Sequence, residues 1–251
     1  MHLSLYYLKN KNVCAFVFFI FLVGVYIASI RIKYPESYFL DDLYFMAREG
    51  KAYDANSDGF DIQTLMSILT IVISIPIVCG QFASNYKKKQ CYIAIRYRNY
   101  IHFYLNEWVN IFVFCFLLSL FYSFGIFAFC FHLSSGELHN SNFPLLYCMS
   151  VLNSTILLLS FSVIAIPFCI KNSKTAILCT IFLFMALTVI SFYLPEKYKC
   201  FDIITLYFVN TLFSKNQLIT DNSIICYAIS LATILLASLY GCKYLKTSEL
   251  K

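Results

Sequence analysis

The chain has 251 residues, of which 60% are hydrophobic and only 13% are charged. A soluble domain usually has about a quarter of its residues charged, so this composition leaves too little polar surface to cover a globule in water and excludes an ordinary soluble protein. The formal net charge of +6 comes without any basic domain outside the apolar segments, which argues against nucleic-acid binding.

Six uncharged apolar segments follow one another along the chain. Each is close to or above the roughly 20 residues that a helix needs to cross a hydrocarbon core. Because lipid cannot hydrogen-bond the backbone, these segments must be helical. The sequence therefore predicts an all-α, polytopic membrane protein with a single transmembrane domain over residues 1–251. The predicted spans are 13–30, 62–84, 109–131, 147–170, 175–194 and 223–242.

Lysine and arginine are unevenly divided between the two sides of the predicted membrane domain. Twelve lie in the N-terminal tail, the second and fourth connections and the C-terminal tail, and seven lie in the longer, more acidic connections on the other side. The positive-inside rule therefore predicts a multi-pass protein of the cell membrane with both termini in the cytoplasm. The first span, preceded by Lys9 and Lys11, is also compatible with a signal peptide, and five remaining spans would still leave the C-terminus inside.

The first external connection, residues 31–61, is long, acidic and rich in turn-forming residues. Two aromatic and aliphatic clusters, at 38–40 and 43–45, interrupt its polar sequence. Such clusters are typical of an interfacial helix, so we expect a short helix lying on the outer surface.

The second connection, residues 85–108, begins with three lysines and then becomes amphipathic. Its apolar and aromatic residues recur at the spacing of one helical face. They are Ile93, Tyr97, Tyr100, Ile101, Tyr104, Leu105 and Trp108. Such a helix either lies on the inner leaflet, with its basic residues near anionic headgroups, or docks onto a cytoplasmic partner.

The predicted spans carry essentially no ionisable residue, and Glu107 lies only at the inner edge of one. This absence argues against a proton-coupled antiporter, which needs a buried carboxylate or histidine relay. The chain also has no G-x-x-x-x-G-K-[ST] motif and no nucleophile-elbow serine, so we expect no enzyme activity, no catalytic residue, no cofactor and no metal site.

Uncharged polar residues do occur in the spans, and they have two interpretations. They either form hydrogen bonds between helices or line a weakly polar translocation path. The candidates for such a path are Gln63, Ser67, Asn110 and Asn153. A further apolar stretch, residues 201–213, is too short to span and contains Asp202 and Asn210, which predicts a re-entrant or interfacial helix on the outside.

The segment YIAIRYRNYIHFYLNEW, residues 92–108, is similar to the I-x-R-Y-x-x-x-x-x-[FWY] coupling segments of small bacterial permeases. Together with the six spans, the amphipathic segment 2–8 and the outer stretch 201–213, the whole layout resembles the type-2 ABC transporter permeases. The acid-R-x-x-G coupling motif of the commoner drug and polysaccharide exporters is absent.

The resemblance implies a permease subunit without an ATPase domain of its own. The lipid bilayer would be its solvent, and its partners would be a separate ATPase subunit and a second permease chain, identical or paralogous. The docking contact would be carried by Arg96, Tyr97, Arg98 and Tyr100. The substrate class implied is a peptide or another amphipathic molecule. The alternative is a non-transporting membrane protein, such as an immunity or sensor subunit.

Overall fold

The computed structural model describes residues 11–32, 39–49, 75, 79, 100–138, 140–171, 173–193 and 221–248. Within these ranges the chain forms six helices and no strand. The helices are α2 (Lys11–Arg31), α3 (Leu40–Glu49), α6 (Tyr100–Leu133), α7 (Phe143–Lys171), α8 (Ser173–Tyr193) and α10 (Asp221–Ser248). The predicted all-α class is therefore confirmed for the described part of the chain.

Four of these helices are long and apolar enough to cross a membrane. Their candidate spans are Cys14–Arg31, Trp108–Leu133, Phe143–Ile166 and Ile224–Gly241. They correspond to the predicted spans 13–30, 109–131, 147–170 and 223–242, with ends that differ by up to four residues. Helix α8 covers residues 175–193 of the predicted span 175–194, and its apolar part in the described side chains is Ile181–Ile190.

Two predicted elements fall largely or wholly outside the described residues. Of span 62–84 the structure describes only Ile75 and Cys79, both helical and buried, and it describes nothing of the stretch 201–213. The short connection predicted after the fourth span is present, because α7 ends at Lys171 and α8 begins at Ser173.

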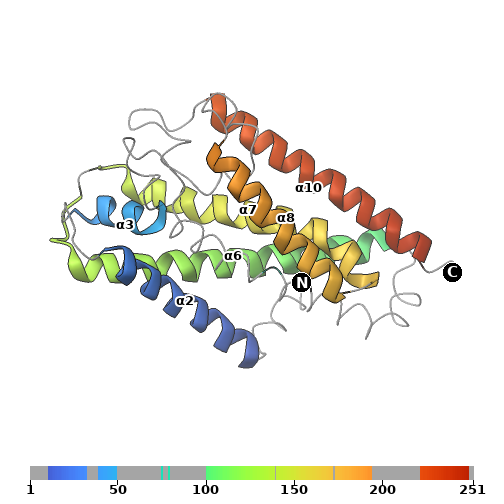
Figure 1. The fold of residues 1–251 in the computed structure, drawn as a ribbon, viewed down its shortest axis with the longest axis horizontal. Coiled ribbons are helices and arrows are strands. Elements are labelled where there is room, and N and C mark those ends of the chain that lie inside the picture. Colours follow the sequence, from blue (N-terminus) through green and yellow to red (C-terminus); the bar gives the residue numbers. More distant parts are fainter. Residues whose placement is uncertain are drawn as a thin grey trace.

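The long helices lie side by side and alternate in direction (Figure 1). Helices α2, α6 and α8 run toward one end of the bundle, and α7 and α10 run back. That end carries the connection between α6 and α7, residues 134–142, and is called the turn end below. The opposite end carries the start of α6 at Tyr100 and the close of α7 at Lys171.

Helix α7 is the centre of the bundle. It packs against α6, α8 and α10, while α2 packs along α6. The candidate span of α7 is 78% buried, compared with 28% for that of α2 and 22% for that of α10. The sequence of α7 is apolar all round with interspersed serine, threonine and asparagine, as a helix surrounded by other helices requires.

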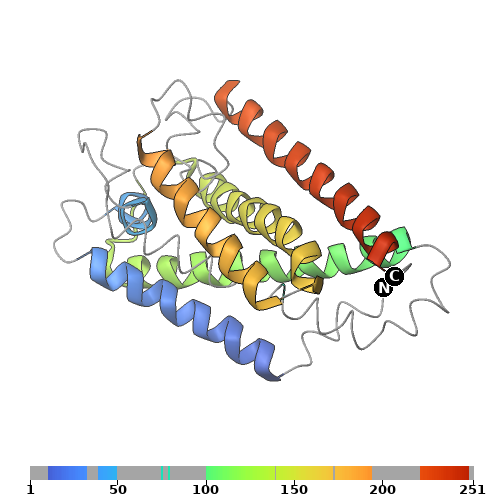
Figure 2. The same ribbon diagram turned by 45° about the vertical axis from the view of Figure 1, so that its right-hand side comes forward.

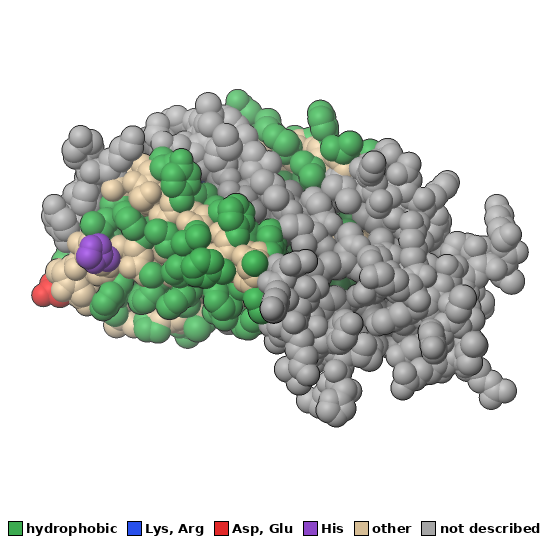
Figure 3. Space-filling view, turned by 90° about the horizontal axis from the view of Figure 1, so that it is seen from below, with side chains coloured by type: hydrophobic (Ala, Val, Ile, Leu, Met, Phe, Trp, Pro, Cys, Tyr) green, Lys and Arg blue, Asp and Glu red, His purple; other side chains and the backbone are tan. Residues whose placement is uncertain are grey.

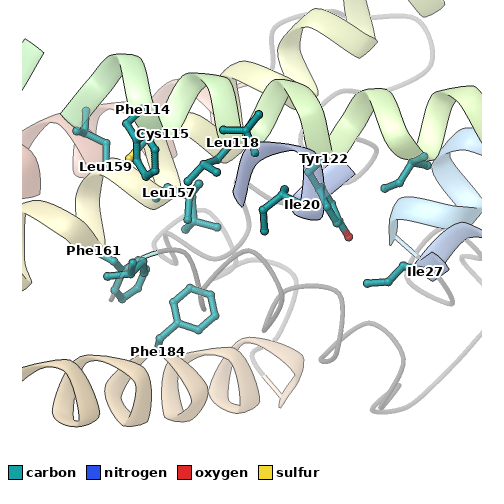
Figure 4. Close-up of a cluster of buried hydrophobic side chains, with 14 of the residues drawn as sticks. Ile20, Ile27, Phe114, Cys115, Leu118, Tyr122, Leu157, Leu159, Phe161 and Phe184 are labelled. Atoms are coloured by element: carbon teal, nitrogen blue, oxygen red, sulfur yellow. The ribbon is translucent and has the colours of Figure 1, made fainter. Parts of the chain in front are cut away.

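The core joins side chains from all six described helices, and Figure 4 shows part of it. Ile20 of α2 lies beside Tyr122 of α6, and the rings of Phe161 on α7 and Phe184 on α8 meet edge to face at 4.7 Å. Outward-facing side chains are equally apolar. Phe182 is 78% exposed, and Figure 3 shows hydrophobic side chains over most of the described part of one face. Exposed apolar surface on this scale fits a lipid surrounding rather than water.

Helices α2 and α6 approach so closely that their backbones touch. A Cβ atom placed on Gly24 would lie 2.4 Å from the carbonyl oxygen of Tyr122, and one on Gly125 would lie 2.3 Å from that of Phe21. Only glycine permits such a crossing, because any Cβ atom would clash with the facing backbone. Close packing of this kind stabilises helix pairs in lipid, where the hydrophobic effect does not drive helices together.

The short helix expected in the first connection is present, but the prediction that it lies on the outer surface is wrong. Helix α3 is inserted at the turn end, against α6 and beside α2 (Figure 2). Eight of its ten residues are buried: Leu40, Asp41, Leu43, Tyr44, Phe45, Ala47, Arg48 and Glu49. The reason is that oxygen atoms of α6 and α7 accept hydrogen bonds from the Arg48 side chain inside the bundle.

Candidate functional site

The first turn of α3 is attached to the connection between α6 and α7. The amide of Leu40 donates a hydrogen bond to the carbonyl of Glu137 over 3.0 Å, and the amide of Asn140 donates one to Oδ2 of Asp41 over 2.8 Å. The carboxylates of Asp41 and Asp42 lie in the first turn, where they also oppose the positive end of the helix dipole. The sequence therefore favours a helix that starts at residue 40.

Arg48, near the other end of α3, is completely buried between α6 and α7. Its Nη1 donates a hydrogen bond to Oγ of Ser123 on α6 over 3.1 Å. Its Nη2 donates to the carbonyl of Ser150 over 2.9 Å and to Oγ of Ser154 over 2.6 Å, both on α7. One guanidinium thus bridges the two helices by donating to three uncharged oxygen atoms. Its several N–H donors in a planar arrangement suit it to bind more than one acceptor at once.

The depth of this guanidinium follows from its partners. Ser123 lies roughly ten residues before the end of α6, and Ser150 and Ser154 lie a similar number after the start of α7. At 1.5 Å per residue the guanidinium is about 10–16 Å inside the helix ends. Both helices are candidate membrane spans there, so Arg48 lies at the level of the apolar parts of α6 and α7.

The predicted spans carry essentially no ionisable residue, as the sequence indicates. Helix α3, which belongs to a connection, nevertheless brings the Arg48 guanidinium between α6 and α7. A charged side chain at this depth is expensive unless it is paired or hydrogen-bonded, and it is a marker of function in membrane proteins.

Two further contacts secure α3. Nη1 of Arg31, the last residue of α2, donates hydrogen bonds to the carbonyls of Ala47 and Arg48 over 2.9 and 2.8 Å. These are carbonyls of the last turn of α3, which have no partner within the helix. The hydroxyl of Tyr44 is hydrogen-bonded to Oγ of Ser150 over 2.9 Å. We call Arg48, Tyr44 and their partners Ser123, Ser150 and Ser154 the α3 anchor.

An aromatic cluster surrounds the anchor on the side of the turn end. The ring of Tyr44 contacts those of Phe143 and Tyr147 at 5.6 and 5.3 Å, and Phe127 contacts Tyr147 at 5.7 Å. Edge-on and tilted contacts of this kind each add about 0.5–1.5 kcal/mol. The guanidinium of Arg48 is itself fully buried, so its hydrogen bonds are made in a low-dielectric surrounding.

Helix α7 carries a series of buried polar side chains through the centre of the bundle. We call it the α7 strip, and it comprises Ser150, Asn153, Ser154, Thr155, Ser160 and Ser162. Some members are satisfied within the helix, since the hydroxyls of Thr155 and Ser160 donate to the carbonyls four residues earlier. Asn153 instead reaches α10, where its Oδ1 accepts a hydrogen bond from the hydroxyl of Tyr227.

The structure separates the candidate path residues that it describes. Asn153 belongs to the α7 strip near the anchor, whereas Asn110, also buried, lies near the other end of α6. Because Ser123 faces Ser154 through Arg48, Asn110 lies about 20 Å further along the bundle, at 1.5 Å per residue. Gln63 and Ser67 lie outside the described residues.

The predicted docking residues are mostly outside the described residues as well. Arg96, Tyr97 and Arg98 are not described, and Tyr100 is the first residue of α6. The described end of the predicted amphipathic segment, residues 100–108, and the predicted third span therefore share one continuous helix from Tyr100 to Leu133. No break separates the end of the docking segment from the membrane part.

Arg48 and Tyr44 are the site residues that sequence reasoning missed. Tyr44 belongs to the cluster 43–45 of the helix expected on the outer surface, and Arg48 has no predicted role beyond its place in the connection 31–61. A usable signal was present: Leu40, Leu43, Tyr44 and Ala47 recur at the spacing of one helical face, with Arg48 next to it. That pattern predicts a helix packed against protein, although it cannot identify the serines that Arg48 contacts.

The hydrogen bond between Asn153 and Tyr227 is a measurable link between α7 and α10. In a cycle of Asn153→Leu, Tyr227→Phe and the double variant, we expect a coupling of about 1 kcal/mol in the free energy of unfolding, as for other hydrogen bonds between membrane helices. Unfolding is followed by circular dichroism in mixed micelles. Thr155→Val with Tyr227→Phe is the matched control and should show no coupling, since the Thr155 hydroxyl bonds within its own helix. An uncoupled Asn153 pair would contradict the contact.

The buried anchor on α3 and the α7 strip have to be interpreted from their own chemistry. No protein-family model matches the chain, and neither a curated protein nor a solved structure matches it significantly.

Proposed function

We propose that the chain is the permease subunit of an ABC exporter in the cell membrane, driven by a separate ATPase subunit and paired with a second permease chain. The observation that carries this proposal is the continuity of α6. The helix begins at Tyr100, within the docking segment, and reaches Ser123, which accepts a hydrogen bond from the buried Arg48. A displacement at the docking end would therefore be transmitted through a rigid helix to the anchor.

The directions of the helices support six spans with both termini in the cytoplasm. Helices α2 and α6 both run toward the turn end. A further span between them would fit these directions, and the segment 62–84 is long enough and apolar enough to supply it. The close of α7, the start of α6 and the end of α10 then share the side that the lysine and arginine distribution assigns to the cytoplasm.

The α7 strip supports a peptide or another amphipathic substrate. Its hydroxyl and amide groups can exchange hydrogen bonds with peptide N–H and C=O groups, while the apolar side chains around them suit hydrophobic residues. It supplies no charged pathway of its own, which fits transport powered by a partner's ATP hydrolysis rather than by protons.

Charge reversal in the docking segment tests the proposal. Tagged chain purified in mild detergent should bring down an ATPase subunit near one to one, and Arg96→Glu with Arg98→Glu should lower that yield at least about tenfold, because acidic side chains replace the contacts that dock the partner. Mass spectrometry and ATPase activity of the purified complex are the measurements.

The matched control is Lys243→Glu with Lys246→Glu, the same change of charge in the C-terminal tail on the same side. This variant should retain the ATPase. If no ATPase accompanies the unaltered chain, or if both double variants lose it equally, the permease proposal fails.

A non-transporting immunity or sensor subunit is the second candidate. The observation that favours it is that α3 fills the space between α6 and α7 at the turn end, with Arg48 and Tyr44 fully buried. Such a protein would bind its ligand without passing it across. It predicts that the chain purifies without an ATPase.

A further inference from the structure

Helix α3 enters the hydrophobic layer without crossing it. Its ten residues extend over only about 15 Å, half of a hydrocarbon core. Both of its ends are attached at or below the turn end, through Leu40 and Asp41 at the start and through Arg48 at the deep end. It therefore fills one half of the bundle and leaves the other half to the long helices.

The deep end of α3 is held by hydrogen bonds of the Arg48 guanidinium. The partners of Arg48 that bridge α6 and α7 are serine oxygens and a backbone carbonyl. Water or a peptide can replace such neutral acceptors, and each serine can bond within its own helix when it is released.

The anchor covers part of the α7 strip. Ser150 and Ser154 are occupied by Tyr44 and Arg48, and Asn153 lies next to them in the same strip. Withdrawal of α3 would uncover Ser150 and Ser154, the members of the α7 strip nearest the turn end, which is the external side in the proposed topology.

We propose that α3 is a removable plug, held in place by Arg48, that closes the external end of the α7 strip until it is withdrawn. Its role in transport rests on the proposed permease function. The attachment of α3 by Arg48 does not depend on that function, so the attachment and the transport role can be tested separately.

Cysteine labelling measures the withdrawal of α3 directly. Ala47→Cys places a small thiol on the fully buried face of α3, and Cys115 of α6, also fully buried, is a native reference for opening of the whole bundle. A membrane-impermeant maleimide is applied to the full chain in proteoliposomes with its external face outward, and labelling is read for each cysteine by peptide mass spectrometry. The other native cysteines then need no replacement.

Weakening the anchor should free α3 and nothing else. In the Ala47→Cys background, Arg48→Met should raise the labelling rate at residue 47 about tenfold or more, because local opening of a helix follows the contacts that hold it. Ser123→Ala with Ser154→Ala, which removes two acceptors and keeps the arginine, should act in the same direction. Cys115 should remain as slow as before in both, and Arg48→Lys should give an intermediate rate at residue 47.

Two results would overturn the plug. If Cys115 and residue 47 gain reactivity together, α3 is an integral part of the core. If neither variant changes labelling at residue 47, Arg48 does not hold α3. If labelling is faster in the variants but no ATPase accompanies the chain, the plug is supported and the permease proposal fails. If labelling is unchanged but an ATPase does accompany the chain, the plug is contradicted and the permease proposal is supported.

Discussion

Gly125→Leu should disrupt the packing of α2 against α6 and lower the free energy of unfolding by about 3 kcal/mol or more. The reason is geometric, since even a Cβ atom at Gly125 would lie 2.3 Å from the carbonyl oxygen of Phe21. That oxygen belongs to a helix backbone and cannot move aside like a side chain, so the two helices must separate along the crossing. Gly125→Ala should give a smaller loss in the same direction.

The measurement is reversible unfolding in mixed micelles with increasing dodecyl sulfate, followed by far-UV circular dichroism. Trp108, the one tryptophan of the chain, supplies a second signal, because its Nε1 donates a hydrogen bond to Ser238 of α10. Ala232→Leu, the same enlargement on the exposed face of α10, is the control and should change stability by less than about 0.5 kcal/mol. Equal stability of Gly125→Leu and the unaltered chain would show that α2 does not cross α6 at these glycines.

Arg48→Glu should be more damaging than any neutral replacement at this position. The change places an acid beside the carbonyl oxygen of Ser150, which now accepts a hydrogen bond from the guanidinium. A buried and uncompensated charge typically costs about 3–5 kcal/mol. We therefore expect α3 to leave the bundle and the unfolding midpoint to fall, with poor recovery of folded protein.

Arg48→Met is the matched comparison for the charge reversal. It removes the cation, keeps a long flexible side chain that fits apolar surroundings, and should leave the free energy of unfolding within about 1 kcal/mol of the unaltered chain. Measured in the same micelles, a Glu variant no less stable than the Met variant would mean that residue 48 is in contact with water. It would also remove the basis of the α3 anchor.

The membrane class and the positions of four long helices could be derived from the sequence. Long uncharged segments such as 109–131 and 223–242 admit one conformation in lipid, because each backbone group must find its partner within the segment. The length of the hydrocarbon core then sets the length of each helix. Asn153 could be nominated as an interior polar residue on the same reasoning, since a polar group inside a span must face other helices.

The place of α3 could not be derived in this way. Its composition, with Asp41, Asp42, Arg48 and Glu49 among ten residues, matches a solvated connection, and local sequence carries no record of which distant groups will satisfy a charge. Ser123 and Ser150 are about 75 and 102 positions away from Arg48. Only the packing of α6 against α7 brings them together around the guanidinium.

The helical, membrane-type character of the chain and the positions of four long apolar helices thus follow from the sequence, because the energy of a backbone in lipid depends on the segment alone. The tertiary structure decided that α2 and α6 meet through Gly24 and Gly125 and that Arg48 is buried between α6 and α7. These features depend on the close approach of segments far apart in the chain, and such an approach is stabilised by packing and by hydrogen bonds between helices rather than by any local property.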